Sequence, residues 1–143
     1  MIRKAEPGDE KSLANLASKL WEHSPEELTE EFEALLQDPK CALFLLYAEN
    51  TPAGFAQCQL RQDYVEGTNS SPVGYLEGVY VEPWVRRKGN ARRLISACEA
   101  WAKAQSCREF ASDCELSNRE SLAFHLASGF TEANRIICFV KPL

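Results

Sequence analysis

A cluster of cations surrounds one glycine in the middle of this chain, and such a cluster could bind an anion. Arg86, Arg87 and Lys88 precede Gly89, and Arg92 follows it closely. The start of a helix carries a partial positive charge and favours acidic neighbours. Cations gathered there repel one another unless an anion lies among them. An isolated run of this kind is more often a solvated surface, so the flanking elements decide between the two interpretations.

The flanking elements favour anion binding. Residues 75–81 (YLEGVYV) are β-branched and aromatic and predict a strand, and the spacing of Leu94, Ile95 and Cys98 predicts a helix that begins close to Gly89. A glycine that permits a close turn, followed by the free N–H groups of a helix start, is typical of a phosphate-binding loop. A P-loop does not fit, because no Gly-Lys-Ser/Thr follows. A dinucleotide fingerprint does not fit either, because its second and third glycines are missing.

Two carboxylates lie in or beside predicted strands. Glu77 interrupts an otherwise apolar strand, where we expect it on the face that carries Val79 and Val81, and Asp113 ends a strand predicted over residues 108–113. A carboxylate in an apolar strand is costly unless it is paired or functional. Glu77 could be a structural partner of a nearby arginine or backbone amide, and Asp113 a turn residue or helix cap. If both are functional, they bind substrate ammonium groups, and one accepts a proton directly or through water.

Composition limits the classes of function. The chain has 143 residues, 45% hydrophobic and 26% charged, which suits a single globular domain over residues 1–143. No run reaches the ~18 apolar residues of a membrane span. The first ten residues lack the apolar core of a signal peptide, so we expect a cytoplasmic protein with no membrane partner. The net charge of −5 argues against nucleic acid and favours a cationic substrate. The six cysteines are scattered, with no CxxC pair and no histidine cluster nearby, so we expect no metal site.

The apolar pattern predicts an α/β fold with a mixed, mostly antiparallel sheet flanked by helices. Asp9 is predicted to cap the first helix, and Ser24 with Glu27 to form a capping box on the second. The predicted strands cover residues 2–6, 41–48, 53–61, 75–81, 108–113 and 136–140. The predicted helices begin near residues 9 and 89 and cover residues 25–37 and 117–128.

Two motifs resemble the GCN5-related N-acetyltransferases, the GNAT family. The first is Arg-x-x-Gly-x-Ala after a strand, present here as Arg86, Gly89 and Ala91, and it is similar to that family's acetyl-CoA pyrophosphate loop. The second is similar to the family's helix and turn and consists of Asn118, Ala123-Phe124-His125 and Gly129-Phe130. The resemblance implies a single-domain GNAT-like fold, acetyl-CoA as co-substrate and a homodimer, for which the C-terminal strand is a plausible interface.

The same resemblance implies which residues hold acetyl-CoA. The thioester would lie beside Val79, Tyr80 and Val81, whose backbone N–H groups bind the carbonyl oxygen and pantetheine and so form the oxyanion donor. Asn118 would bind the pantetheine arm. The pyrophosphate would lie on the loop formed by Arg86, Arg87, Lys88, Gly89, Asn90, Ala91 and Arg92.

A narrower resemblance extends over nearly the whole chain and is firmest from Arg61 onward. The segments that are similar to aminoglycoside 6′-N-acetyltransferases are Trp21, Asp63-Tyr64-Val65-x-Gly67, Ser70-Ser71-Pro72, Leu76-Glu77-Gly78 and Ala111-Ser112-Asp113. It implies that Trp21, Tyr64, Glu77 and Asp113 line an aminoglycoside site. Physical chemistry agrees, because a polyamine sugar needs carboxylates for its ammonium groups and aromatic faces for its rings. Trp21 could instead cover the core between two helices, whereas an aromatic residue in a polar loop, such as Tyr64, is better explained by a ligand.

Four further residues are candidates with open alternatives. His23 could bind substrate or lie on the surface beside its Ser-Pro cap, and either Glu132 or Asn134 could add a substrate contact. Many GNAT enzymes carry a tyrosine that protonates the departing thiolate, at the position where this chain has His125. A histidine is suited to proton transfer near neutral pH, but His125 could equally be a packing residue, with water as the acid.

The residues and the resemblance together predict an enzyme that transfers acetyl from acetyl-CoA to the 6′-amine of an aminoglycoside. The sequence offers no Ser-His-Asp set, which favours direct attack of the amine over a covalent acetyl-enzyme. Alternative acceptors are a protein N-terminus, a lysine or a polyamine. A different class would be a non-catalytic domain that binds or senses acyl-CoA.

Overall fold

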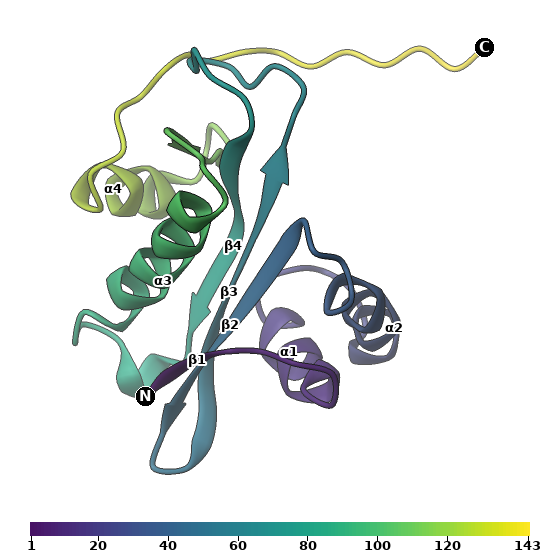
Figure 1. Ribbon diagram of the computed structural model, residues 1–143, viewed down its shortest axis with the longest axis vertical. Helices are drawn as coiled ribbons and strands as arrows, with labels where there is room; N and C mark the ends of the chain where they lie inside the picture. Colours follow the sequence, from purple (N-terminus) through teal and green to yellow (C-terminus); the bar gives the residue numbers. More distant parts are fainter.

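The computed structural model describes residues 1–143, whose five strands form one sheet in the order β1-β2-β3-β4-β5 (Figure 1). The first four strands pair antiparallel, and only β4 and β5 pair in parallel. This confirms the predicted mixed, mostly antiparallel sheet. The strands are β1 (Ile2–Lys4), β2 (Cys41–Ala48), β3 (Thr51–Arg61), β4 (Val73–Val81) and β5 (Phe110–Ala111).

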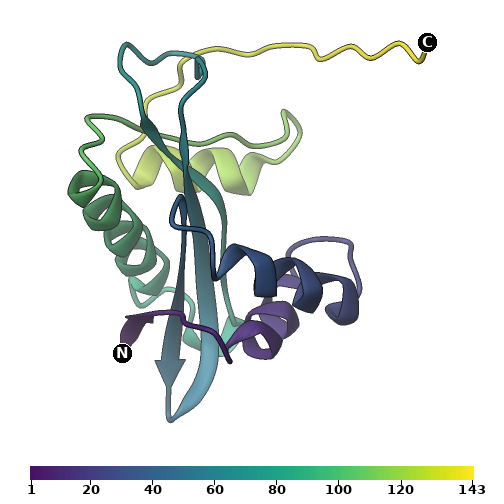
Figure 2. The same ribbon diagram turned by 45° about the vertical axis from the view of Figure 1, so that its right-hand side comes forward.

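The helices form a layer on each face of the sheet (Figures 1 and 2). The first layer consists of α1 (Glu10–Ala17) and α2 (Pro25–Leu35), and the second of α3 (Asn90–Ala104) and α4 (Arg119–Ala127). A short 3-10 helix, η1 (Pro83–Val85), connects β4 to the loop before α3. None of the helices is long and apolar enough to cross a membrane.

Each helical layer buries its own apolar core against the sheet. Beneath α1 and α2, the ring of Phe55 meets those of Phe32 and Trp21 edge-on, with centroids 6.3 and 5.7 Å apart. Beneath α3, Leu94, Ile95 and Cys98 pack on the opposite face of β2, β3 and β4. A fully buried leucine or phenylalanine contributes roughly 1.5–3 kcal/mol. Burial on both faces makes the central strands a rigid base for the site.

The caps of the first two helices differ from each other. The predicted capping box on α2 is confirmed, because the Ser24 hydroxyl accepts from the Glu27 N–H at 3.2 Å and the Glu27 carboxylate accepts from the Ser24 N–H at 3.4 Å. Asp9 is the N-cap residue of α1, as predicted, but its side chain makes no capping hydrogen bond. Its carboxylate is held by Arg3 instead.

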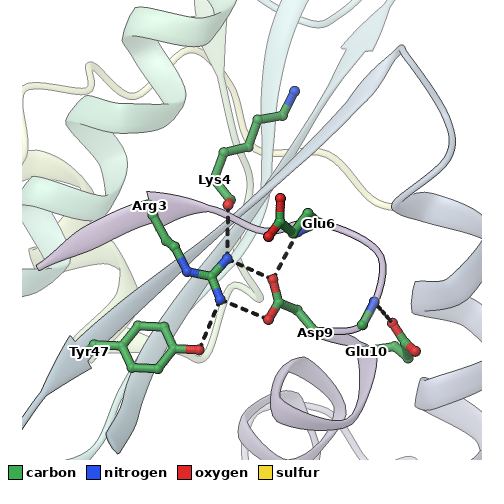
Figure 3. Close-up of polar contacts among 7 residues, drawn as sticks. Arg3, Lys4, Glu6, Asp9, Glu10 and Tyr47 are labelled. Carbon is green, nitrogen blue, oxygen red and sulfur yellow. Dashed lines mark hydrogen bonds and ion pairs between the residues drawn. The ribbon is translucent and has the colours of Figure 1, made fainter. Parts of the chain in front are cut away.

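Arg3 ties β1 to the start of α1 (Figure 3). Its guanidinium donates to both carboxylate oxygens of Asp9, at 2.7 and 2.8 Å, and to the hydroxyl of Tyr47 at 3.1 Å. The Arg3 side chain is 34% exposed and that of Asp9 13%. The hydrogen bonds from Arg3 lower the pKa of Asp9, against the opposing effect of burial.

A β-bulge in β4 changes the direction of Glu77. Gln57 pairs with Gly78 and Cys58 pairs with Leu76, so Glu77 has no partner on β3. Leu76, Val79 and Val81 all pack on the side of α3. Glu77 lies with Tyr75 on the other side, where Arg61 contacts both residues. The prediction that Glu77 shares a face with Val79 and Val81 is therefore wrong, because the extra residue of the bulge shifts the alternation by one.

The pairing of β4 with β5 ends early. Only Gly74 with Phe110 and Tyr75 with Ala111 are paired, so β5 is shorter than the predicted strand over residues 108–113. Beyond Tyr75, β4 continues to Val81 with a strand partner on one side alone. The backbone groups on the other edge of this half of β4 are consequently available to a ligand.

The strand predicted over residues 136–140 is wrong. After α4 the chain runs as an extended segment without regular structure, and Figure 1 shows it leaving the body of the protein. Its apolar side chains are exposed, from 67% at Ile136 to 94% at Val140. The sequence has the β-branched pattern of a strand, but the segment finds no strand to pair with in its own chain.

We predict that Asp9→Asn lowers the free energy of unfolding by about 1–2 kcal/mol at pH 7, because a partly buried ion pair becomes a neutral contact. The folded-state pKa of Asp9 is depressed. The stabilisation is therefore fully present above the unfolded pKa of about 3.9 and is lost as pH falls through the lower folded value.

Urea unfolding of the wild type and Asp9→Asn, from pH 7 downward, measures this difference. Glu33→Gln is the control, because Glu33 is an exposed carboxylate of α2. A wild-type advantage that stays constant below pH 3 would contradict the role given to Asp9.

Candidate active site

The loop between η1 and α3 has the backbone of an anion-binding site. Arg87 and Gly89 both adopt left-handed conformations, with φ of 61° and 78°. The next helix begins at Asn90, and the N–H groups from Gly89 to Arg92 donate to no group of the protein. A Cβ at Gly89 would meet nothing within 4 Å. Unpaired N–H groups that converge on open space bind phosphate oxygens.

The cations of this loop divide into two kinds. Arg86 and Arg92 shape the site, since Arg86 donates through Nε to the Val81 carbonyl at 2.7 Å and Arg92 donates to the carbonyl of Ala127 at the end of α4. Arg87 and Lys88 are exposed and have no hydrogen-bond or ion-pair partner in the protein. They are consequently the cations that are free to neutralise an anion.

Two uncharged residues of the loop set its geometry. Asn90 donates through Nδ2 to the Val85 carbonyl at 2.9 Å and accepts from Arg93 at 3.0 Å, which fixes the turn before the helix. Ala91 packs against the core beneath α3, where its small side chain allows the start of the helix to lie close to the sheet. The first helical turn contains no acidic residue that could replace an anion.

The loop and the free edge of β4 together fit acetyl-CoA. The loop supplies donors and cations for a diphosphate, and the half of β4 that β5 leaves unpaired, Val79 to Val81, supplies backbone groups for a thioester and its amide-containing arm. The predicted residue Asn118 is the N-cap of α4, where its Oδ1 accepts from the Ser121 N–H at 3.0 Å. The amide nitrogen of Asn118 has no partner in the protein and can still donate to the arm.

Beyond Tyr75 and Ala111, β4 and β5 separate and leave a gap between them. The two predicted carboxylates lie in one network where this gap begins, at the end away from the anion-binding loop. Glu77 accepts from Nη2 of Arg61 at 2.9 Å, and the Arg61 guanidinium lies over the ring of Tyr75, 3.5 Å from its centroid. The Tyr75 hydroxyl donates in turn to Asp113. Burial, and then this bond to Asp113, raise the pKa of Tyr75, so its hydroxyl stays protonated and remains a donor. The structure thus gives Glu77 the arginine partner that sequence reasoning left open.

The two predicted aromatic residues differ in their surroundings. Trp21 packs edge-on against Phe55, and its Cζ2 lies 2.5 Å from where a Cβ on Gly78 would stand. The indole therefore both covers the core and lies against β4 beside Glu77. Tyr64 lies in the loop after β3; the residue is 74% exposed, and its hydroxyl accepts from the Gly67 N–H at 3.3 Å.

That loop, residues 62–72, is held in place by Glu109. Its carboxylate accepts from the Asn69 N–H at 2.8 Å and from the Ser70 hydroxyl, and these bonds lower the pKa of Glu109. The loop lies against the segment after α4, because a side chain on Gly67 would collide with Ala133.

His125 connects α4 to the gap between β4 and β5. Its Nδ1 lies 2.6 Å from the carbonyl of Ser121, and its Nε2 lies 2.9 Å from the Ser112 hydroxyl. Ser112 in turn donates to the carbonyl of Leu76, at 3.2 Å, where the two strands separate. The ring also packs against Phe130, with centroids 5.2 Å apart. The structure is therefore compatible with both interpretations of His125. It is a packing residue against Phe130, and it is also one end of a chain of polar contacts that leads to the gap.

The remaining candidates lie at the periphery. His23 is 61% exposed and lies 3.6 Å from the Glu27 carboxylate, on the surface before α2. Glu132 pairs with Arg135, which lowers the pKa of Glu132, and Asn134 donates to Glu66 at 3.1 Å. Neither Glu132 nor Asn134 contacts the network of Glu77 and Asp113.

Sequence reasoning missed three residues of the site: Arg61, Tyr75 and Ser112. That Tyr75 lies on the same face as Glu77 could have been predicted, because the two residues are two positions apart on one strand. To place Arg61 in the site, one must know the register of β3 against β4. To place Ser112 there, one must know the position of α4. Neither can be derived from local patterns.

The sequence and the fold together define the class of this protein. The acetyltransferase (GNAT) family matches residues 10–130, and the chain belongs to that family. This confirms the predicted family and the GNAT-like fold.

Relatives narrow the similarity. The chain is 43% identical to an aminoglycoside N(6′)-acetyltransferase type 1 of Stenotrophomonas maltophilia, over 99% of this chain and 93% of the relative. A crystal structure of an aminoglycoside antibiotic 6′-N-acetyltransferase from Acinetobacter haemolyticus superposes with a TM-score of 0.95 at 38% identity, covering 100% of this chain and 99% of that one. AAC(6′)-Iy in complex with the bisubstrate analogue CoA-S-monomethyl-acetylneamine also gives a TM-score of 0.95, at 36% identity over 100% and 98% of the two chains.

We predict that Gly89→Asp weakens the binding of CoA by about tenfold or more, which corresponds to at least about 1.4 kcal/mol. The new carboxylate would lie among the N–H groups that face the diphosphate, and the residue would have to keep a left-handed φ. The open space around Gly89 means that the fold itself should persist.

Isothermal titration of CoA measures this effect. Gly8→Asp is the matched control, because Gly8 has a φ of 110°, also has open space, and lies in the turn before α1. Equal CoA affinity in the two variants would contradict the assignment of the loop.

Proposed function

We propose that this chain transfers an acetyl group from acetyl-CoA to the 6′-amino group of aminoglycosides. The observation that carries the proposal is one gap in the sheet with an anion-binding loop at one end and a carboxylate-aromatic network at the other. The first end suits the diphosphate of CoA, and the second suits an ammonium-bearing sugar. The relatives that match the chain over nearly its whole length carry the same activity in their names.

The reaction is a direct transfer between two bound substrates. Acetyl-CoA supplies an activated acetyl group as a thioester. The amine nitrogen forms a bond to the carbonyl carbon, the carbon–sulfur bond breaks, and the amine's proton passes to a base while the sulfur gains one. The backbone N–H groups of the unpaired half of β4 stabilise the charge on the carbonyl oxygen. This chain's own part is to bind, orient and exchange protons, because no acylated side chain is required.

The proton transfers fall to the network and to His125. Asp113 accepts one bond from Tyr75 and carries no ion pair, so it is the carboxylate free to bind the substrate ammonium and to accept its proton, directly or through water. Glu77 binds an ammonium group beside it. His125 is the proposed acid for the departing sulfur, through the hydroxyl of Ser112 where the strands separate.

The other proposed substrate contacts are Trp21 and Tyr64, which offer aromatic faces, and His23, Glu132 and Asn134 at the rim. An acceptor such as a protein N-terminus, a lysine or a linear polyamine is the second candidate. A compact polycation is favoured over these, because the carboxylates are grouped at one place and not spread along a groove.

We further propose that residues 1–143 act as one catalytic domain in the cytoplasm, as a homodimer and without nucleic acid. The dimer is supported by the exposed apolar segment after α4, which resembles a strand in sequence, and by the open outer edge of β5. A second copy of the chain could cover both. Light scattering of the wild type should give twice the mass of one chain, whereas Ile137→Asp should give a single chain. A monomeric wild type would contradict this arrangement.

The function is tested by measuring thiol release from acetyl-CoA with a panel of acceptors. We expect turnover with kanamycin and tobramycin, and none with a kanamycin analogue that has a hydroxyl in place of the 6′-amine. Activity on a mixed peptide pool but not on the sugars would replace the proposed acceptor by the second candidate. Binding of CoA without turnover of any amine would favour a non-catalytic domain.

In the same assay, Asp113→Asn should raise the KM for kanamycin by about tenfold, because a charge-assisted contact is lost, and leave the KM for acetyl-CoA nearly unchanged. Glu49→Gln is the control, because Glu49 is an exposed carboxylate in the turn between β2 and β3, at the end of these strands away from Tyr75. Equal changes in both KM values, with a loss of folding, would show that Asp113 is structural.

A further inference from the structure

Arg61 occupies the place where the proposed site would hold an ammonium group. It is the last residue of β3, and its guanidinium lies against two groups that also attract a substrate cation. One is the Glu77 carboxylate, 2.9 Å away, and the other is the face of the Tyr75 ring, whose centroid is 3.5 Å from Cζ. A carboxylate and an aromatic face are the same two elements that recognise an aminoglycoside ammonium.

Arg61 is also held loosely enough to leave. Its side chain is 39% exposed, and that of Glu77 is 22% exposed. Beyond its bond to Glu77, the guanidinium makes no hydrogen bond in the protein. The residue stands at the end of a strand and at the start of the loop over residues 62–72, so the side chain can turn toward solvent without disturbing the sheet. Partly exposed ion pairs of this kind contribute little to stability.

We propose that Arg61 is a specificity-determining residue for the reaction: it acts as an internal cation on Glu77 and Tyr75 that an ammonium group of the substrate must displace. This inference rests on the proposed function. A single weak cation competes poorly with Arg61, because a guanidinium that stacks and pairs is well matched to the two groups. A polycation with several contacts at the site displaces it more readily. Arg61 thus selects acceptors that carry several charges.

The exchange predicts that removing the arginine tightens substrate binding. Arg61→Gln should bind kanamycin about threefold to tenfold more tightly than the wild type, since the competing cation is gone and the ring of Tyr75 is free. Arg61→Lys keeps the charge but lacks the planar group that stacks on the ring, so its affinity should fall between the two. If Arg61 instead positioned Glu77 for the substrate, the order of affinities would be reversed, with weaker binding in Arg61→Gln.

Isothermal titration of kanamycin into each CoA-bound protein decides between these roles. Lys11→Gln is the matched control, because it removes one exposed positive charge from α1. Tighter binding in Arg61→Gln, intermediate binding in Arg61→Lys and no change in Lys11→Gln would support the exchange. Unchanged or weaker binding in both Arg61 variants, or an equal gain in Lys11→Gln, would overturn it. If Arg61→Gln does not fold, the comparison of Arg61→Lys with the wild type decides.

A failure of the proposed function can be distinguished from a failure of the role given to Arg61, because these titrations measure binding without turnover. Binding of kanamycin without acetyl transfer in the wild type would contradict the proposed function, and the order of affinities would still test Arg61. Turnover with no gain in Arg61→Gln would contradict the role of Arg61 alone. If kanamycin binds to none of the proteins, both proposals are wrong.

Discussion

The separation of β4 from β5 after Tyr75 and Ala111 is the constraint on which the rest of the structure depends. A parallel pair that continued to Val81 would satisfy its own backbone groups and leave no polar edge inside the protein. Because β5 stops, half of β4 keeps free donors and acceptors along one edge. The short pairing that remains still places Tyr75, Ser112 and Asp113 at the point where the strands part. The bulge at Glu77 lies two residues beyond Tyr75 and turns this carboxylate toward Arg61.

Charge is distributed along this gap in a way that follows the proposed chemistry. At the end near α3, Arg87 and Lys88 have no partner in the protein, and the first turn of the helix has no acidic residue. No negatively charged side chain therefore balances the cations at that end. At the other end, Arg61 pairs with Glu77, whereas Asp113 accepts a hydrogen bond from Tyr75 and has no cationic partner. The first end is prepared for a group that the protein does not supply, whereas the second end holds a cation of its own in that place. The two ends therefore differ in how they select a ligand, the first by attraction and the second by exchange.

Local patterns predicted the parts of the fold that short-range forces determine. The helix start after Gly89 and the capping box of α2 are confirmed, because the residues that determine each are contiguous in sequence. Two predictions failed, and the cap of α1 lacks its side-chain bond, where distant residues decide. Asp9 turned from its helix to Arg3, the bulge moved Glu77 to the other face, and residues 136–140 had no strand to pair with. The roles of Glu77 and His125 were open for the same reason, since Arg61, Ser112 and Phe130 reach them only through tertiary structure.

The position of the acetyl group on the product tests the central claim most directly. The protein would be incubated with kanamycin and acetyl-CoA labelled with ¹³C in the acetyl group, and the product examined by two-dimensional NMR. The account predicts one labelled acetyl group, with its carbonyl coupled to the protons of the 6′-position. A label on another amine would contradict the geometry proposed for the carboxylate network. If the protein binds CoA but no labelled kanamycin forms, the acetyl transfer itself would be contradicted.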